Sequence, residues 1–317
     1  MSKAARPATK SDFLVRFWGV RGSFPVSGEG FLHFGGNTSC VEIRAGGHLV
    51  ICDMGTGMIR LGNELLRDHL RSGDAATRRR PVEAVILVSH AHHDHTQGFP
   101  FFKPAYLESS VLHIFGPRMC NEDFRQIMER AMMAPLFPVD LVDMRGSQVI
   151  RNAEDSEVIV LRPGKPPETV STQRNEARID PGTVTIQVRR NYAHPKGGVI
   201  NYRVSWGGRS VVYATDVEGY VGGDARLVSF SRGADLLIHD AQYLPEEYTG
   251  LPVPTQGFGH STFEMAAGVA TAAGVKRLAL FHHDPSHTDD DIREIEKQAA
   301  RAFPRSFAAY EGQEVPI

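Results

Sequence analysis

The chain has 317 residues and a formal net charge of −2, with 41% hydrophobic and 23% charged residues. This length and composition are typical of a globular protein with a large buried core, built as one large domain or as two. The near-neutral charge excludes a general attraction to nucleic acid or anionic lipid. A polyanionic partner would therefore need a basic patch that the totals hide.

No segment is typical of a membrane anchor or a secretion signal. Residues 1–11 are polar and are expected to form a flexible lead, and no stretch of about 18 apolar residues occurs. The three cysteines, Cys40, Cys52 and Cys120, have no CxxC spacing and are expected to be reduced. We therefore expect a cytoplasmic protein.

The chain up to residue 133 alternates predicted strands and helices. Apolar residues at helical spacing predict helices over 58–70 and 121–133. Short apolar runs predict strands at 13–18, 82–89 and 110–115. They also predict two strands within 40–53, joined by a turn at Gly46-Gly47. Residues 134–180 are rich in Pro, Gly and charge, and we predict a single strand there, at 156–161.

A second series of strands and helices follows. Strands are predicted at 183–190, 198–206, 210–215, 234–240 and 275–281. One helix covers 263–274 and ends at Gly274, and a last helix covers 289–303 with an acidic first turn. Two such series predict an α/β (α+β) fold, a sandwich of two sheets with helices outside, in one domain over 12–317.

Residues 89–98, "SHAHHDHTQG", concentrate imidazoles around one aspartate. Alternate residues of an extended segment point the same way, so His90 and His92 are expected to bind one cation. Asp94 and His95 follow where the chain turns, and they are expected to face a second cation, while His93 points away. The alternative is a hydrated histidine-rich loop that binds metal only weakly.

Three residues remote from this cluster complete a possible site. His194, Asp216 and His282 each follow an apolar strand, where loops held by a rigid scaffold carry functional groups. Each alone would more often be a surface histidine or a turn aspartate. Their shared position at strand ends argues against that interpretation for all three together.

The order HxHxDH, His, Asp, His resembles the metallo-β-lactamase-fold hydrolases over nearly the whole chain. The segments "FWGVRGSFP", "GGNTSCVEI" and "LVICDMGTG" are similar to that superfamily's opening strands, with Asp53 at its first motif. The resemblance implies a four-layer αββα sandwich with two metals at one edge. It further implies one metal held by His90, His92 and His194, another held by Asp94, His95 and His282, and a bridging Asp216. His283 is the alternative to His282 as the last ligand.

The types of the candidate ligands narrow the choice of metal and of reaction. Nitrogen and oxygen ligands suit zinc first and also tolerate manganese or iron. By resemblance, the diiron oxygen-reductase branch has a Glu where His92 stands, and the zinc β-lactamases use a Cys ligand that this chain lacks near its motifs. We therefore expect hydrolysis, with a metal-bridging hydroxide as the nucleophile and with Asp94 and Asp216 orienting it.

The segments "DLLIHDAQY", "GFGHSTFEMA" and "GVKRLALFHHD" resemble the phosphodiesterase branch that includes the tRNA 3′-processing endonucleases (RNase Z). The resemblance assigns His260 as the proton donor to the leaving group or as a partner of a phosphate oxygen. The alternative is that His260 only precedes a helix cap made by Ser261 or Thr262.

The chain departs from the tRNA-processing enzymes in one respect. Asp216 follows His194 by only 22 residues, which leaves no room for their long tRNA-binding arm. The chain looks more like armless relatives that cleave small cyclic phosphodiesters, so extended nucleic acid is not expected as the substrate. We predict that 134–180 forms a lid or an interface of a homodimer. Arg21 is expected to contact substrate phosphate, unless it is only an exposed loop arginine.

The sequence thus predicts a dinuclear phosphodiesterase that acts on a small cyclic or nucleotide-like phosphodiester. RNA 3′-end processing and acyl, lactone or thioester hydrolysis are the alternatives among enzymes. A metal-bound sensor without turnover is the alternative from another class, and the complete ligand set argues against it.

Overall fold

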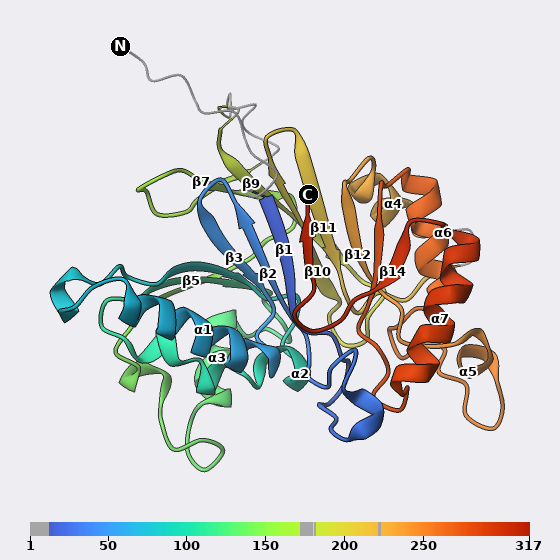
Figure 1. The fold of residues 1–317 in the computed structure, drawn as a ribbon, viewed down its shortest axis with the longest axis horizontal. Helices are drawn as coiled ribbons and strands as arrows, with labels where there is room; N and C mark the ends of the chain where they lie inside the picture. Colours follow the sequence, from blue (N-terminus) through green and yellow to red (C-terminus); the bar gives the residue numbers. More distant parts are fainter. Residues whose placement is uncertain (1–12, 172–179, 181, 221–222) are drawn as a thin grey trace.

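The structure, a computed structural model, describes residues 13–171, 180, 182–220 and 223–317. The expected lead at 1–11 lies outside these residues. Two sheets face each other, and helices cover their outer faces (Figure 1). This is the four-layer sandwich that the sequence predicts. No helix in the described ranges is long and apolar enough to cross a membrane.

The first sheet has seven strands, in the order β15-β1-β2-β3-β4-β5-β6. Their bounds are β1 (Phe13–Gly19), β2 (Cys40–Ala45), β3 (His48–Cys52), β4 (Glu83–Leu87), β5 (Val111–Gly116), β6 (Ser147–Asn152) and β15 (Glu314–Pro316). Helices α1 (Gly57–Arg71) and α3 (Phe124–Ala131) lie on its outer face (Figure 1). The predicted turn joins β2 to β3, because Gly46 and Gly47 adopt the positive φ angles of 54° and 83° that a tight hairpin requires.

The second sheet has eight strands, in the order β14-β13-β12-β11-β10-β9-β7-β8. Their bounds are β7 (Glu157–Leu161), β8 (Glu168–Ser171), β9 (Val184–Asn191), β10 (Val199–Trp206), β11 (Arg209–Ala214), β12 (Leu236–Asp240), β13 (Leu278–Phe281) and β14 (Ser306–Ala308). Helices α4 (Ala225–Ser231), α6 (Phe263–Ala273) and α7 (Asp289–Ala302) lie outside it (Figure 1).

Short helices occupy the loops. They are α2 (His93–Thr96), α5 (Pro245–Thr249) and the 3-10 turns η2 (Glu29–Phe31), η3 (Ala76–Arg78), η4 (Phe99–Phe101), η5 (Lys103–Tyr106) and η6 (Leu141–Asp143). Helix α2 starts inside the histidine cluster, which confirms that the chain turns there.

The expectation of a single strand in residues 134–180 is wrong. Strands β6, β7 and β8 extend the edges of the two sheets, so these segments belong to the sandwich, and a role of this stretch as a lid or an interface stays a prediction. The sequence pattern missed β6 and β8 because edge strands are only half-buried, which leaves little apolar alternation to recognise. Residues 172–179 of this stretch lie outside the described residues.

The main core lies between the sheets. Phe17 of β1 and Phe281 of β13 meet there from opposite sheets, with ring centroids 6.0 Å apart. Both rings are fully buried, and β13 leads directly into His282. Packing in the core therefore positions one of the candidate metal ligands.

We predict that Phe17→Ala lowers the free energy of unfolding by about 3–5 kcal/mol, because it leaves a cavity between the sheets. Leu32→Ala is the control, since Leu32 is 79% exposed and its loss is expected to cost less than about 0.5 kcal/mol. Urea denaturation followed by circular dichroism measures both. Equal effects of the two substitutions would contradict this account of the core.

Candidate metal centre

The candidate ligands lie at one edge of the sandwich, directly after the ends of strands. Asp53 follows β3, Asp216 lies two residues after β11, and His282 follows β13. All three have left-handed backbone conformations, with φ angles of 61°, 53° and 62°. Such angles are uncommon and strained for residues other than glycine, and they concentrate at functional sites.

His90, His92 and His194 form the first group. Their ligand atoms all lie within 4.8 Å of one another, and Nδ1 of His92 is 3.2 Å from Nε2 of His194. Burial lowers the pKa of each of the three imidazoles, as does the proximity of other histidines. Neutral rings present a free nitrogen lone pair, and the buried Nε2 of His90 has no hydrogen-bond partner.

Asp94, His95, Asp216 and His282 form the second group, also with all ligand atoms within 4.8 Å. Nε2 of His95 lies 3.1 Å from Oδ2 of Asp94 and 3.2 Å from Nε2 of His282. Burial opposes ionisation of both carboxyls, but the neighbouring histidines hold the pKa of Asp94 and of Asp216 well below the ordinary range. The group therefore buries two ionised carboxylates.

Asp216 joins the two groups through its two oxygens. Oδ1 lies 3.6 Å from Nε2 of His90 in the first group. Oδ2 lies 3.2 Å from Nε2 of His95 and 3.3 Å from Nε2 of His282 in the second. A carboxylate between two sets of nitrogen donors fits a pair of divalent cations, whose charge would offset the burial of the carboxylates.

Hydrogen bonds from the remote ring nitrogens orient the imidazoles. Nδ1 of His95 donates to Asp53 at 2.7 Å, and Nδ1 of His194 donates to the carbonyl of Gly259 at 3.1 Å. Nδ1 of His282 donates to the side-chain oxygen of Gln242 at 3.0 Å. Nε2 of each of these rings is thereby free to face a cation.

His260 lies against the same cluster and is held by a buried carboxylate. Its Nδ1 donates to Oδ2 of Asp240 at 2.7 Å, and Asp240 also accepts the backbone N–H groups of Asp216 and Ser261. Burial opposes protonation of His260, but Asp240 and Asp216 raise its pKa to about 9. Thr262 caps helix α6 by accepting the N–H of Met265, as the capping alternative expects, and His260 is in addition held by Asp240 against the cluster.

A hollow of about 390 Å³ opens over the cluster. Its lining consists of Ser23, Ala91, His92, His93, Asp94, Asp216 and His260. The imidazole of His260, held by Asp240, therefore reaches the space where a substrate would lie.

Two histidines and one arginine named from the sequence lie apart from the ligand groups. His93 is exposed and belongs to none of the groups found among the described residues. His283 donates through Nε2 to the carbonyl of Ala309 and points away, so His282 is the residue that meets the cluster.

The expectation that Arg21 contacts substrate is wrong. Its side chain is fully buried and donates to the carbonyls of Gly35, Asp284 and His287 at 2.7–3.0 Å. The guanidinium therefore ties the loop after β1 to the loop after β13. A short "VRGS" motif does not show that the arginine turns inward.

Several groups around the site were not selected from the sequence. They are Asp240, Gln242, Ser89 and Tyr213. Asp240 ends an apolar strand, and the reasoning that selected Asp216 would have found it as well. No local pattern marks the other three, because their partners come from distant segments.

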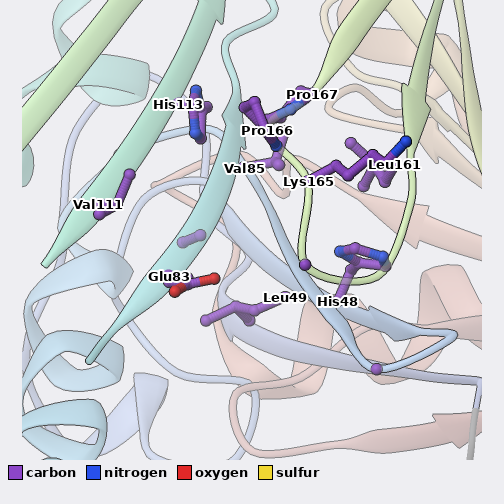
Figure 2. A pocket seen from close by; sticks show the side chains of 13 residues that line it. His48, Leu49, Glu83, Val85, Val111, His113, Leu161, Lys165, Pro166 and Pro167 are labelled. Carbon is purple, nitrogen blue, oxygen red and sulfur yellow. The ribbon is translucent and has the colours of Figure 1, made fainter. Parts of the chain in front are cut away.

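The second cavity, of about 310 Å³, lies between the sheets at the starting ends of β3, β4 and β5 (Figure 2). His48, Glu83 and His113 line it. The candidate ligands follow the opposite ends of β3 and β4. Over the described ranges, these three side chains form no group of converging ligand atoms, so this cavity is not the metal centre.

Residues 48–283 match the model of the β-lactamase superfamily domain. The chain belongs to this superfamily. It is a metal-dependent hydrolase, as the sequence predicts, and its fold implies bound divalent metal ions.

The curated relatives include two proteins named ribonuclease Z. The Metallosphaera sedula protein is 29% identical over 248 residues, which cover 70% of this chain and 77% of that protein. The Ignicoccus hospitalis protein is 30% identical over 251 residues, which cover 74% and 80%. The crystal structure of the metallo-β-lactamase-fold protein YhfI from Bacillus subtilis superposes with a TM-score of 0.63 at 19% identity, covering 96% and 98%, and shows the shared fold.

We predict that the zinc-loaded chain retains two metal equivalents after dialysis and that His90→Ala and His282→Ala each lose at least one. His93→Ala is the matched control, because His93 lies in the same sequence cluster but outside the ligand groups. Inductively coupled plasma mass spectrometry measures the metal content. Unchanged content in both His90→Ala and His282→Ala would refute the assignment of these groups.

Proposed function

We propose that the chain is a dinuclear phosphodiesterase that hydrolyses a nucleotide-like phosphodiester. The pairing of His260 with Asp240 at the edge of the metal centre carries this proposal. The leaving alkoxide of a phosphodiester departs poorly unless it is protonated, and a carboxylate-held imidazole is a suitable proton donor.

In this proposal His90, His92 and His194 hold one cation, Asp94, His95 and His282 hold the other, and Asp216 contacts both. Zinc is the first candidate for these nitrogen and oxygen donors, and manganese or iron also suits them. The chemistry supplied by such a metal pair, when bound, is polarisation of a phosphoryl oxygen and a lowered pKa of water.

His260 moves a proton at its Nε2 atom. Its Nδ1–H stays on Asp240, so in the protonated ring the Nε2–H is the one that faces the hollow. As the phosphorus–oxygen bond to the leaving group breaks, that oxygen takes the proton and the ring becomes neutral. Asp240 fixes the orientation of the ring throughout and stabilises its positive charge before the transfer.

Two kinds of substrate fit this chemistry. The short interval between His194 and Asp216, without a tRNA-binding arm, favours a small cyclic or nucleotide-like phosphodiester. The second candidate function is RNA 3′-end processing, and the similarity to two proteins named ribonuclease Z favours it. Cleavage of either substrate breaks the same kind of phosphorus–oxygen bond and requires a proton donor for the leaving group.

We predict that His260→Ala slows hydrolysis of 3′,5′-cyclic AMP by about 10²–10⁴ in kcat, because its alkoxide leaving group needs a proton. The same variant is expected to lose far less rate on bis(p-nitrophenyl) phosphate, whose nitrophenolate leaves without one. Asp240→Asn should give the same pattern with a smaller loss. Steady-state kinetics of the zinc-loaded proteins measure both substrates.

Equal losses on the two substrates, with metal content retained, would show that His260 does not act as the proton donor. Hydrolysis of neither substrate by the wild-type protein, loaded with zinc or manganese, would refute the phosphodiesterase itself. A preference for a thioester or a lactone would instead select acyl hydrolysis.

A further inference from the structure

A groove rich in arginine runs along the outer face of the second sheet and starts beside the metal centre. It consists of two adjoining hollows, of about 230 and 370 Å³, which share Arg189 and Arg226 in their linings. We call it the arginine groove and define it by Arg189, Arg203, Arg226, Tyr192 and Tyr220.

The strand register sets the direction of the groove. Asn191 pairs with Val199, Arg189 pairs with Asn201, and Gln187 pairs with Arg203. Tyr192 precedes the candidate ligand His194 by two residues, so the end at Asn191 is the one near the metal centre. From residue 191 to residue 187 the groove extends for about 13 Å, at roughly 3.3 Å per residue.

Helix α4 forms the other wall. Asp224, which precedes it, accepts a hydrogen bond of 2.9 Å from the side-chain amide of Asn191. The other oxygen of Asp224 caps the helix by accepting the N–H groups of Arg226 and Leu227. Asp224 is the one acidic side chain in the described lining of the two hollows. Both of its oxygens already accept hydrogen bonds within the protein.

The positive charge of the groove is poorly compensated. Among the described residues, no carboxylate forms an ion pair with Arg203 or Arg226. Arg203 donates to the carbonyls of Phe230 and Arg232 and to the hydroxyl of Ser210, which satisfies its N–H groups without neutralising its charge. Arg189 is 3.7 Å from Asp155, and its buried Nε has no hydrogen-bond partner.

Two exposed tyrosines lie at the end of the groove nearest the metal centre. Tyr192 is 69% exposed and Tyr220 is 54% exposed, and both line the smaller hollow. Aromatic side chains beside clustered arginines are the usual means of binding single-stranded nucleic acid, because bases stack on the rings while the cations contact phosphates. The chain as a whole has a net charge of −2, so this accumulation is local.

We propose that the arginine groove binds the single strand of an RNA that continues from the scissile phosphodiester. Tyr192 and Tyr220 stack against bases next to the metal centre, and Arg189 and Arg226 contact the phosphates beyond them. This inference rests on the proposed phosphodiesterase and names its substrate class, an oligonucleotide rather than an isolated cyclic phosphate.

The test compares a fluorescein-labelled 12-nucleotide RNA with bis(p-nitrophenyl) phosphate, using the full metal-loaded chain. In the variant Arg189→Gln/Arg226→Gln, the ratio of kcat/KM for the RNA to kcat/KM for the small substrate is expected to fall about tenfold. For the RNA, the slope of log KM against the logarithm of the salt concentration should decrease by about 1.4, because each lost phosphate contact with a single strand contributes roughly 0.7.

Arg67→Gln/Arg78→Gln is the matched control. Both arginines are more than 60% exposed and lie on the first sheet's side, so this pair removes the same charge away from the groove. Its ratio of kcat/KM values and its salt slope should equal those of the wild type. A second comparison uses Tyr192→Ala, which should lower the ratio about fivefold or more, while Tyr192→Phe retains it.

Fluorescence anisotropy of the labelled RNA provides a second measurement that does not depend on turnover. The groove variant should bind the RNA about tenfold more weakly than the control pair. Equal ratios and equal affinities in the two arginine pairs would overturn the groove even if the phosphodiesterase is active. If neither substrate is hydrolysed, the proposed function fails and the anisotropy alone decides whether the groove binds RNA.

Discussion

The buried carboxylate of Asp53 connects the parts of the molecule on which the metal centre depends. It follows β3 of the first sheet and accepts hydrogen bonds from the N–H and hydroxyl groups of Ser89, from Nδ1 of His95 and from the hydroxyl of Tyr213 in the second sheet. One residue thus joins the two sheets at the edge where the ligands gather. A charge this deeply buried is stable only with several donors around it, so the neighbouring segments are held in one arrangement.

The same edge explains why so many ionisable groups tolerate burial. Asp216 and Asp240 are almost completely buried, and each is surrounded by imidazoles or backbone N–H groups. The strained backbone at Asp216 and His282 directs these side chains over the ends of the strands, towards the loops that carry the histidine cluster. Such strain persists only where the surrounding structure is rigid, and the packed core between the sheets supplies that rigidity.

Sequence reasoning succeeded where a pattern is local or lies at the end of an apolar strand. The cluster at 89–98, together with His194, Asp216 and His282, could be selected in this way, and the structure brings their ligand atoms together. It failed for Arg21, because nothing near the motif shows that carbonyls from residues 284 and 287 surround the guanidinium. Edge strands β6 and β8 were missed because they bury little surface, and the groove was hidden because total charge says nothing about where charges lie.

The short interval between His194 and Asp216 does not exclude a surface for nucleic acid elsewhere on the chain. Strands β9 and β10 are joined by a short connection, and α4 has only seven residues, so a hollow stays open between the sheet and this helix. Arg203 donates to the carbonyls of Phe230 and Arg232 beside it, which satisfies its N–H groups without neutralising its charge. In an open groove such charges can be offset by an anionic polymer instead of by buried carboxylate partners. In our proposal the chemistry lies at the edge of the sandwich and the strand binds on the adjacent outer face. The outer face, and not the metal centre, would then set the length of the substrate.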